Sequence, residues 1–354
     1  MTPYLIGSGT VRYSSIRASN GKYVLVQQPN GFINLHAIEG KLIRTLPREI
    51  RTDTQPVWSR TSVEYVYTVE GNQLWCRHVI TDAAELITSF SEYVSISAEV
   101  AEGDLSELGC LALCGVFTAG SNEVFIYDIF RKKKLLATPV VAFDGLKIAP
   151  DNQWILSRTS DPRDSVIDGI FLANGMKLAS YNGHACPSDK GLLWCSSADP
   201  KANANAAVLI PYEDPSRITV LKRFDWRYAM HITAGSDAGY VGVYAPDGSL
   251  PYQIWELPFA GGEKLLFEWT GPYRGYDSSP KPTFGAGMLC FNRDNGVWGM
   301  ALTTASPAIV DPSLKEIKID YDSYVGNTDF IIRPQHKCPT CGSTIAGIFE
   351  RKKV

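Results

Sequence analysis

Ala149-Pro150-Asp151-Asn152-Gln153-Trp154-Ile155-Leu156 is a turn-prone cluster followed directly by a run of β-forming residues. The pattern recurs along the chain, and the first strong apolar residues of its copies are Tyr23, Tyr65, Trp154, Leu192, Tyr240 and Met288. Their spacings are 42, 89, 38, 48 and 48 residues, and the 89 corresponds to two periods with a degenerate copy around Leu111. A period of about 45 residues built from short strands is typical of propeller blades.

Seven such periods fill the chain and predict an all-β fold, a seven-bladed β-propeller of four-stranded antiparallel blades. We expect the propeller to occupy residues 1–318, and residues 319–354 to form a C-terminal closing strand with a cysteine-containing tail. Because each blade packs only on its neighbours, a chain of 354 residues can form one body. The β-rich residues 4–6 or 329–332 can close the ring, which removes an open edge strand.

Composition and charge exclude several classes of protein. The chain is 45% hydrophobic and 20% charged, as a globular protein is, and its formal net charge of -3 offers no electrostatic footprint for nucleic acid. The first residues lack the basic start and long apolar core of a secretory signal. The most apolar stretch, residues 108–117, is too short to span a bilayer. The sequence therefore predicts a cytoplasmic or virion-associated protein with no membrane span.

The chain has eight cysteines, and two of them form a motif in the C-terminal tail. Cys338-Pro339-Thr340-Cys341-Gly342 matches the knuckle that supplies two thiolates to tetrahedral zinc. His336, Cys186 or a partner chain could supply further ligands. A zinc site, a local disulfide or redox pair, and an unligated pair of thiols remain open for Cys338 and Cys341. Five other cysteines lie in apolar runs and are expected to pack as small hydrophobic residues: Cys76, Cys110, Cys114, Cys195 and Cys290.

Two segments carry a resemblance to a known family. Pro56-Val57-Trp58-Ser59, followed by Tyr65-Val66-Tyr67 and Gln73-Leu74-Trp75, resembles the repeat of TolB-type propellers, as does Ile148-Ala149-Pro150-Asp151 with the strand after it. The resemblance covers most of the chain, although only the fourth copy keeps the Pro-Asp pair. Propellers with WD repeats are less similar, because no Gly-His pair occurs with a Trp-Asp ending at the required spacing.

Within the TolB-like group, oligogalacturonate lyases use several histidines where inner strands begin to hold a divalent metal in the central channel. This resemblance implies a channel metal at His184, His231 and Asp277, with Asp144 at the corresponding place in the fourth blade. A metal held there would acidify the α-proton of a substrate, as in a metal-dependent polysaccharide lyase. The alternative is that the two histidines are hydrogen bonded by neighbouring backbone groups.

A second candidate site combines aromatic and arginine side chains in connections that lead into inner strands. The residues concerned are Trp226, Arg227, Tyr228, Tyr273, Arg274 and Tyr276. Such connections share one face of a propeller, where aromatic rings can stack on a sugar or a peptide. Arginine can pair there with a carboxylate. The alternative is that these side chains wedge between blades and form salt bridges at the rim.

A basic cluster, Arg131-Lys132-Lys133-Lys134, falls at a turn between two strands of the third blade. It is either a solvated turn or an anion-binding patch. Catalytic templates for serine hydrolases, P-loop enzymes and zinc peptidases do not occur in the sequence.

We therefore expect a binding or assembly module whose aromatic and arginine-rich face meets a protein or carbohydrate ligand. A metal-dependent polysaccharide lyase or other glycan-active enzyme is the first alternative. A structural component of a larger particle is the second, and self-association as a homo-oligomer is compatible with both non-enzymatic roles.

Overall fold

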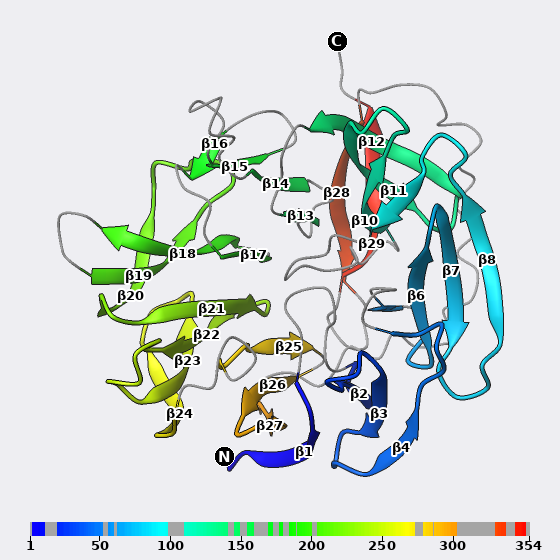
Figure 1. Ribbon diagram of the computed structural model, residues 1–354. Helices are drawn as coiled ribbons and strands as arrows, with labels where there is room; N and C mark the ends of the chain where they lie inside the picture. Colours follow the sequence, from blue (N-terminus) through cyan, green and yellow to red (C-terminus); the bar gives the residue numbers. More distant parts are fainter. Residues whose placement is uncertain are drawn as a thin grey trace. The chain divides into compact units, whose positions relative to one another are not determined.

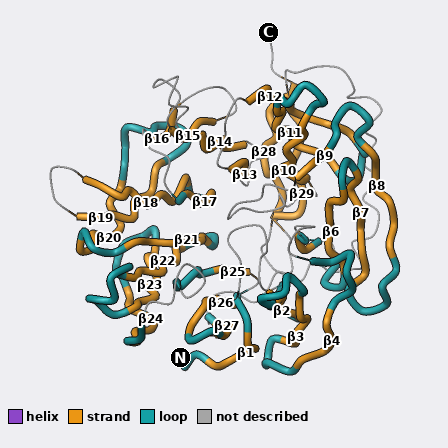
Figure 2. Tube along the Cα trace, in the orientation of Figure 1, coloured by secondary structure: helices purple, strands orange, loops and turns teal. Residues whose placement is uncertain are grey.

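In the computed structural model, the described residues are 2–10, 20–51, 56–59, 62–97, 110–140, 145–148, 154–158, 169–172, 177–179, 184–188, 190–199, 204–272, 279–285, 287–302, 330–337 and 344–351. They contain strands and loops but no helix (Figure 2). None of them therefore forms a helix that could cross a bilayer. The chain divides into two compact units, Met1–Thr304 and Ala305–Val354.

Six antiparallel sheets of the first unit contain four strands each, and most follow the order of the chain (Figure 1). Four of them are β5 (Val57–Trp58), β6 (Tyr65–Glu70), β7 (Gln73–His78) and β8 (Ala84–Ser89); β9 (Ser95–Ser97), β10 (Cys110–Val116), β11 (Asn122–Asp128) and β12 (Lys133–Val140); β13 (Gly145–Ile148), β14 (Trp154–Arg158), β15 (Gly169–Leu172) and β16 (Lys177–Ala179); and β17 (Ala185–Ser188), β18 (Gly191–Asp199), β19 (Ala204–Ile210) and β20 (Thr219–Asp225). The fifth is β21 (Ala229–Ala234), β22 (Ala238–Tyr244), β23 (Tyr252–Pro258) and β24 (Lys264–Trp269).

The sixth four-stranded sheet joins the two ends of the first unit. It contains β25 (Thr283–Gly285), β26 (Met288–Arg293), β27 (Gly296–Ala301) and the N-terminal β1 (Tyr4–Ser8). Strand β1 pairs with β27 in antiparallel register, with Leu5 opposite Trp298. Of the two segments predicted to close the ring, residues 4–6 therefore pair with the last sheet, through β27. In the second unit, β28 (Phe330–Lys337) pairs with β29 (Thr344–Arg351).

The remaining sheet differs from the predicted four strands. It contains β2 (Tyr23–Gln27), β3 (Ile33–Ala37) and β4 (Leu42–Thr45), and no fourth strand pairs with it among the described residues. The all-β propeller of antiparallel blades is confirmed, whereas the count of seven four-stranded blades stays a prediction. The predicted boundary at residues 318–319 falls outside the described residues, so that division also stays a prediction.

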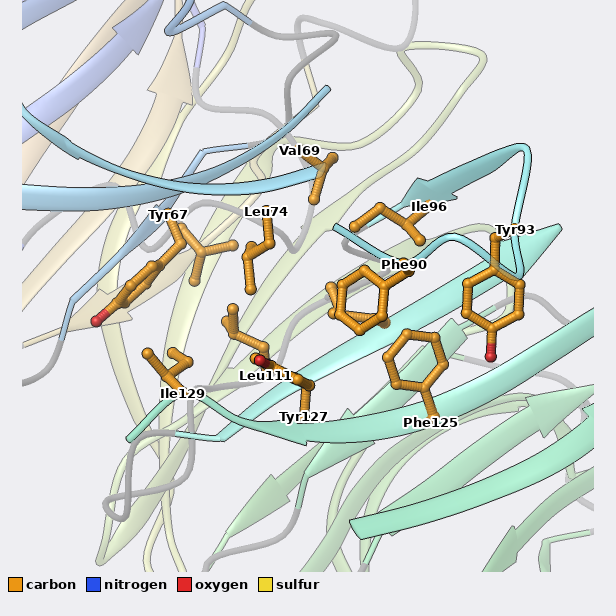
Figure 3. Packing of buried hydrophobic residues seen from close by; sticks show 12 residues of the cluster. Tyr67, Val69, Leu74, Phe90, Tyr93, Ile96, Leu111, Phe125, Tyr127 and Ile129 are labelled. Carbon is orange, nitrogen blue, oxygen red and sulfur yellow. The ribbon is translucent and has the colours of Figure 1, made fainter. Parts of the chain in front are cut away.

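Hydrophobic clusters join several of the sheets to their neighbours. One cluster packs Tyr67 and Leu74 of the β5–β8 sheet against Leu111 and Phe125 of the β9–β12 sheet (Figure 3). Another joins the sheet of β17–β20 to that of β21–β24, and a third joins the latter to β26 and β27. Stability in such a fold comes from contacts between neighbouring repeats. Four of the cysteines expected to pack or to serve as ligands are buried: Cys114, Cys186, Cys195 and Cys290.

Tight turns set the register of the hairpins. Gly71 adopts a φ of 58° between β6 and β7, where Glu70 lies opposite Gln73. Gly31, with a φ of 82°, closes the turn between β2 and β3. A left-handed backbone conformation is available to glycine without steric cost. The residues at these turns, Glu70-Gly71-Asn72 and Pro29-Asn30-Gly31, are of types that favour tight hairpin turns.

Candidate functional site

Trp226, Arg227 and Tyr228 form the connection between β20 and β21, two strands of neighbouring sheets. Ala229, the first residue of β21, lies opposite Tyr244, the last residue of β22. The connection therefore shares one end of the β21–β24 sheet with the loop between β22 and β23. In a propeller, these two kinds of connection lie on the same face.

Hydrogen bonds with two nearby side chains, Asn205 and Asp225, hold the backbone of this connection in place. The Asn205 amide donates to the carbonyl oxygen of Trp226 at 3.2 Å, and a second hydrogen bond joins it to the carbonyl oxygen of Tyr228. The backbone N–H of Arg227 donates to Asp225 Oδ1 at 3.0 Å. Because Asn205 is buried, the two hydrogen bonds that it donates are shielded from water and fix the loop before any ligand arrives.

The side chains of the connection differ in exposure. Trp226 is 62% exposed, whereas Tyr228 is 8% exposed and packs in the cluster between the two sheets. Burying an indole ring is favourable and leaving it in water forgoes that gain, so the fold alone does not explain a tryptophan at position 226. Tyr228 contributes to the core and presents little surface to a ligand.

Arg227 is already paired within the loop. Its Nε donates to Asp225 Oδ1 at 3.0 Å and its Nη2 to Asp225 Oδ2 at 2.8 Å, which makes a bidentate pair. The guanidinium lowers the pKa of Asp225 to about 2, and the carboxylate in turn raises the pKa of Arg227. Arg227 therefore offers little capacity to bind a carboxylate of a ligand.

Further carboxylates lie beside the paired arginine. The backbone N–H of Ser249 donates to Asp247 at 2.9 Å, and hydrogen bonds from Ser249 hold the pKa of Asp247 below its usual range. The charges of Asp247 and Arg227 act on each other, and that of Glu268 acts on Tyr228. Among the described residues, the charges that act on Arg227 and Tyr228 thus come mainly from carboxylates.

The two predicted channel histidines do lie together. His184 precedes β17 and His231 lies in β21, and their ring centroids are 4.8 Å apart in an edge-to-face arrangement. His231 also stacks on Tyr244 with centroids 5.4 Å apart. His231 Nε2 is 3.2 Å from Ser279 Oγ, which belongs to the segment ahead of β25. The contacts thus link the inner strands of three consecutive sheets.

Burial determines the chemistry of this cluster. His231 is 3% exposed and Ser279 has no exposed surface. Burial, together with the positive charge of Lys281, lowers the pKa of His231 to about 3. His231 is therefore neutral and a weak base, and Ser279 cannot be reached by a substrate. The pair does not have the properties of a nucleophile with its general base.

A divalent metal does not fit the described residues of this cluster. No group of three or more His, Cys, Asp or Glu side chains lies together within the described ranges. Lys281 is buried beside His231 and carries a positive charge that would repel a metal ion. Asp277, the third predicted ligand, lies outside the described residues, so the predicted channel metal stays a prediction.

Several predicted site residues lie outside the described part of the chain. They are Tyr273, Arg274 and Tyr276 of the aromatic site, and Cys338 and Cys341 of the tail. The zinc site and its alternatives at the two cysteines therefore stay predictions, as does the grouping of Tyr273 and Arg274 with Trp226.

Sequence reasoning missed three residues that the structure brings to these sites: Asn205, Ser279 and Lys281. Ser279 follows His231 by 48 residues, one repeat period, and this spacing could have identified it. Asn205 lies in a different repeat from the carbonyl groups that it holds, and no local pattern marks such a contact.

Comparisons with solved structures find other propellers. An oligogalacturonate lyase from Vibrio parahaemolyticus matches with a TM-score of 0.59 at 12% identity over 83% of this chain and 90% of that chain. An oligogalacturonate lyase in complex with manganese matches with a TM-score of 0.61 at 10% identity, covering 85% and 91%. The propeller domain of the trilobed protease from Pyrococcus furiosus matches with a TM-score of 0.51 at 10% identity, covering 86% and 99%.

No protein-family profile and no curated protein sequence matches the chain. The structural similarity nevertheless confirms the predicted likeness to TolB-like propellers and, distantly, to oligogalacturonate lyases. At these identities the likeness concerns the fold and leaves the activity of this chain to its own residues.

Proposed function

We propose that the chain is a propeller binding module whose ligand, a protein or a carbohydrate, docks on the face that carries Trp226. The observation that carries the proposal is an exposed tryptophan on a backbone that the buried Asn205 and the exposed Asp225 already hold. A rigid aromatic side chain loses little conformational entropy on binding. Tryptophan is also among the residues that contribute most to binding energy at interfaces.

The charges beside Trp226 narrow the chemistry of the ligand. Arg227 is occupied by Asp225, and Asp247 adds a further carboxylate. A ligand rich in carboxylates, such as an oligogalacturonate, would meet net repulsion there. The site favours a neutral sugar or a protein surface that is neutral or basic. These charges therefore favour a binding module over a lyase that acts on acidic polysaccharides.

The proposal predicts that Trp226→Ala weakens binding by about thirtyfold or more, since an interface tryptophan of this kind contributes at least about 2 kcal/mol. The melting temperature should change little, because the indole is exposed. Neutral oligosaccharides, oligogalacturonates and peptides of basic or neutral composition serve as probes, and calorimetry measures the affinity of each.

Phe130→Ala is the matched control, because Phe130 is equally exposed at 62% but lies in the turn between β11 and β12. Equal affinities of the Trp226→Ala variant and the wild type for every probe that binds would refute the proposal. Cleavage of oligogalacturonate that disappears in His231→Gln would instead establish the lyase alternative.

A further inference from the structure

The turn between β11 and β12 carries an exposed aromatic ring and a group of cations. Residues 129–132 connect Asp128 to Lys133, which lie opposite each other in the sheet. Phe130 is 62% exposed, and the side chains of Arg131, Lys132 and Lys133 are also exposed. We refer to residues 130–133 as the basic tip. It belongs to the basic cluster that the sequence predicts to be either a solvated turn or an anion-binding patch.

The basic tip has a fixed backbone. The side chain of Asp128, which is 6% exposed, accepts a hydrogen bond from the backbone N–H of Arg131 at 2.9 Å. The guanidinium of Arg131 lies 3.6 Å from the same carboxylate. Asp128 therefore orders the turn and offsets one charge, and the positive charges of Lys132 and Lys133 remain in excess.

Lys132 adopts a backbone conformation that favours glycine. Its φ is 51°, in the left-handed region, where a residue with a Cβ atom is strained and glycine is not. Glycine occupies comparable positions in other turns of the chain, such as Gly31 and Gly71. Asp82, Asp294 and Asn295 also adopt a positive φ, but lysine lacks their short polar side chain, so glycine would relieve strain at position 132.

Lys134, the second residue of β12, is by contrast a lysine with a structural role. Its Nζ lies 2.8 Å from Glu92 and 3.2 Å from Glu123, and 4.3 Å from the centroid of the Tyr93 ring. These carboxylates neutralise its charge. Lys132 and Lys133 of the basic tip have a different environment, because both are exposed.

Turns equivalent to the basic tip in the other described sheets carry more acidic than basic side chains. The turn of the basic tip joins the third and fourth strands of its sheet, and equivalent turns of other sheets share its face in a propeller. The described turns of this kind contain two basic residues, Lys41 and Arg217, and five acidic ones: Glu39, Asp82, Glu213, Asp214 and Glu263. A broad anionic surface such as a lipid bilayer would meet repulsion from these carboxylates. A narrow acidic ligand that contacts only the basic tip would avoid them.

We propose that the basic tip is a second docking surface, and that its partner is an acidic segment of another protein that carries at least one aliphatic side chain. Carboxylates of the segment pair with Lys132 and Lys133, and the aliphatic group covers the ring of Phe130. Because Trp226 lies on the opposite face, the chain can hold two partners at once. The proposal is independent of the ligand bound at Trp226.

A fluorescein-labelled peptide of alternating glutamate and leucine is the probe, and fluorescence anisotropy at low and moderate salt measures its affinity. Loss of one contact between unit charges in a water-like medium corresponds to about fivefold in affinity. We therefore expect Lys132→Gly to weaken binding about fivefold while leaving the melting temperature equal or higher. Phe130→Ala should weaken binding about tenfold, which corresponds to burial of part of one ring. Added salt should weaken binding by the wild type.

Two controls separate this proposal from a general effect of charge. Lys41→Gln removes an exposed lysine from the turn between β3 and β4 and should leave the affinity unchanged. The same peptide with glutamine in place of glutamate should bind at least tenfold more weakly. Trp226→Ala should not affect peptide binding, so failure here and failure of the proposed function are distinguishable.

Three results would overturn the proposal. The first is equal peptide affinity in the wild type and the Lys132→Gly variant. The second is binding to phosphatidylcholine vesicles that contain phosphatidylserine without binding to the peptide. The third is preference for single-stranded oligothymidylate over the peptide, which would assign the basic tip to nucleic acid.

Discussion

Phe125→Ala is expected to lower the free energy of unfolding by about 3–5 kcal/mol, the usual cost of removing a fully buried phenylalanine. Phe125 has no exposed surface and lies between two other aromatic rings. Its ring is stacked on Tyr93 with centroids 5.5 Å apart and lies 5.3 Å from that of Phe90 (Figure 3). Truncation would leave a cavity where the β5–β8 and β9–β12 sheets join. Urea denaturation followed by circular dichroism measures the change.

Phe130→Ala is the control for this experiment, because it removes the same side chain from the same sheet at an exposed position. Its effect on stability should stay within about 0.5 kcal/mol. A loss below about 1 kcal/mol in Phe125→Ala would mean that the sheets rearrange to fill the cavity. The contact between the β5–β8 and β9–β12 sheets would then contribute less to stability than the packing indicates.

Lowering the pH from 7 to 5 is expected to cost about 2 kcal/mol of stability through His231 alone. Burial lowers the pKa of this histidine from its ordinary 6.5 to about 3 in the folded protein. The unfolded chain therefore takes up a proton near pH 6.5, whereas the folded chain does so only near pH 3. The stabilisation is fully present above pH 6.5 and is lost as the pH falls toward 3.

Urea denaturation at several pH values between 7 and 5 measures this dependence, and His231→Gln is the matched variant because it cannot titrate in that range. The wild type should lose about 2 kcal/mol more than the variant over the two pH units. Identical pH dependence in the two proteins would contradict a pKa of about 3 for His231. It would also remove the argument that this histidine is too weak a base for catalysis.

The hairpins of the propeller could be predicted from local sequence. Gly31 and Gly71 mark turns because only glycine adopts their φ values without strain, and the flanking β-formers supply the strands. The repeat period likewise predicted that His184 and His231 lie together, since equivalent positions in successive blades are neighbours. The period could also have located Ser279, one repeat beyond His231.

The side-chain partners at the candidate site could not be predicted in the same way. Arginine at position 227 was expected to face a ligand, but Asp225 lies two residues away and already pairs with it in bidentate geometry. For Tyr228 the sequence allows both a ligand-facing position and a place between blades, and the structure buries it. A sequence of aromatic and charged residues does not state which side chain turns inward, because that depends on the sheet against which the loop packs.

Sequence alone determined the class of fold, because turn residues and the alternation of β-formers act over a few residues and repeat with a regular period. Tertiary structure decided the burial of Lys281 beside His231, the hold of Asn205 on the Trp226 loop, and the different environments of Lys132 and Lys134. These features arise where segments from different strands or sheets meet. Their energies depend on desolvation and on distances between charges, which exist only once the sheets have packed.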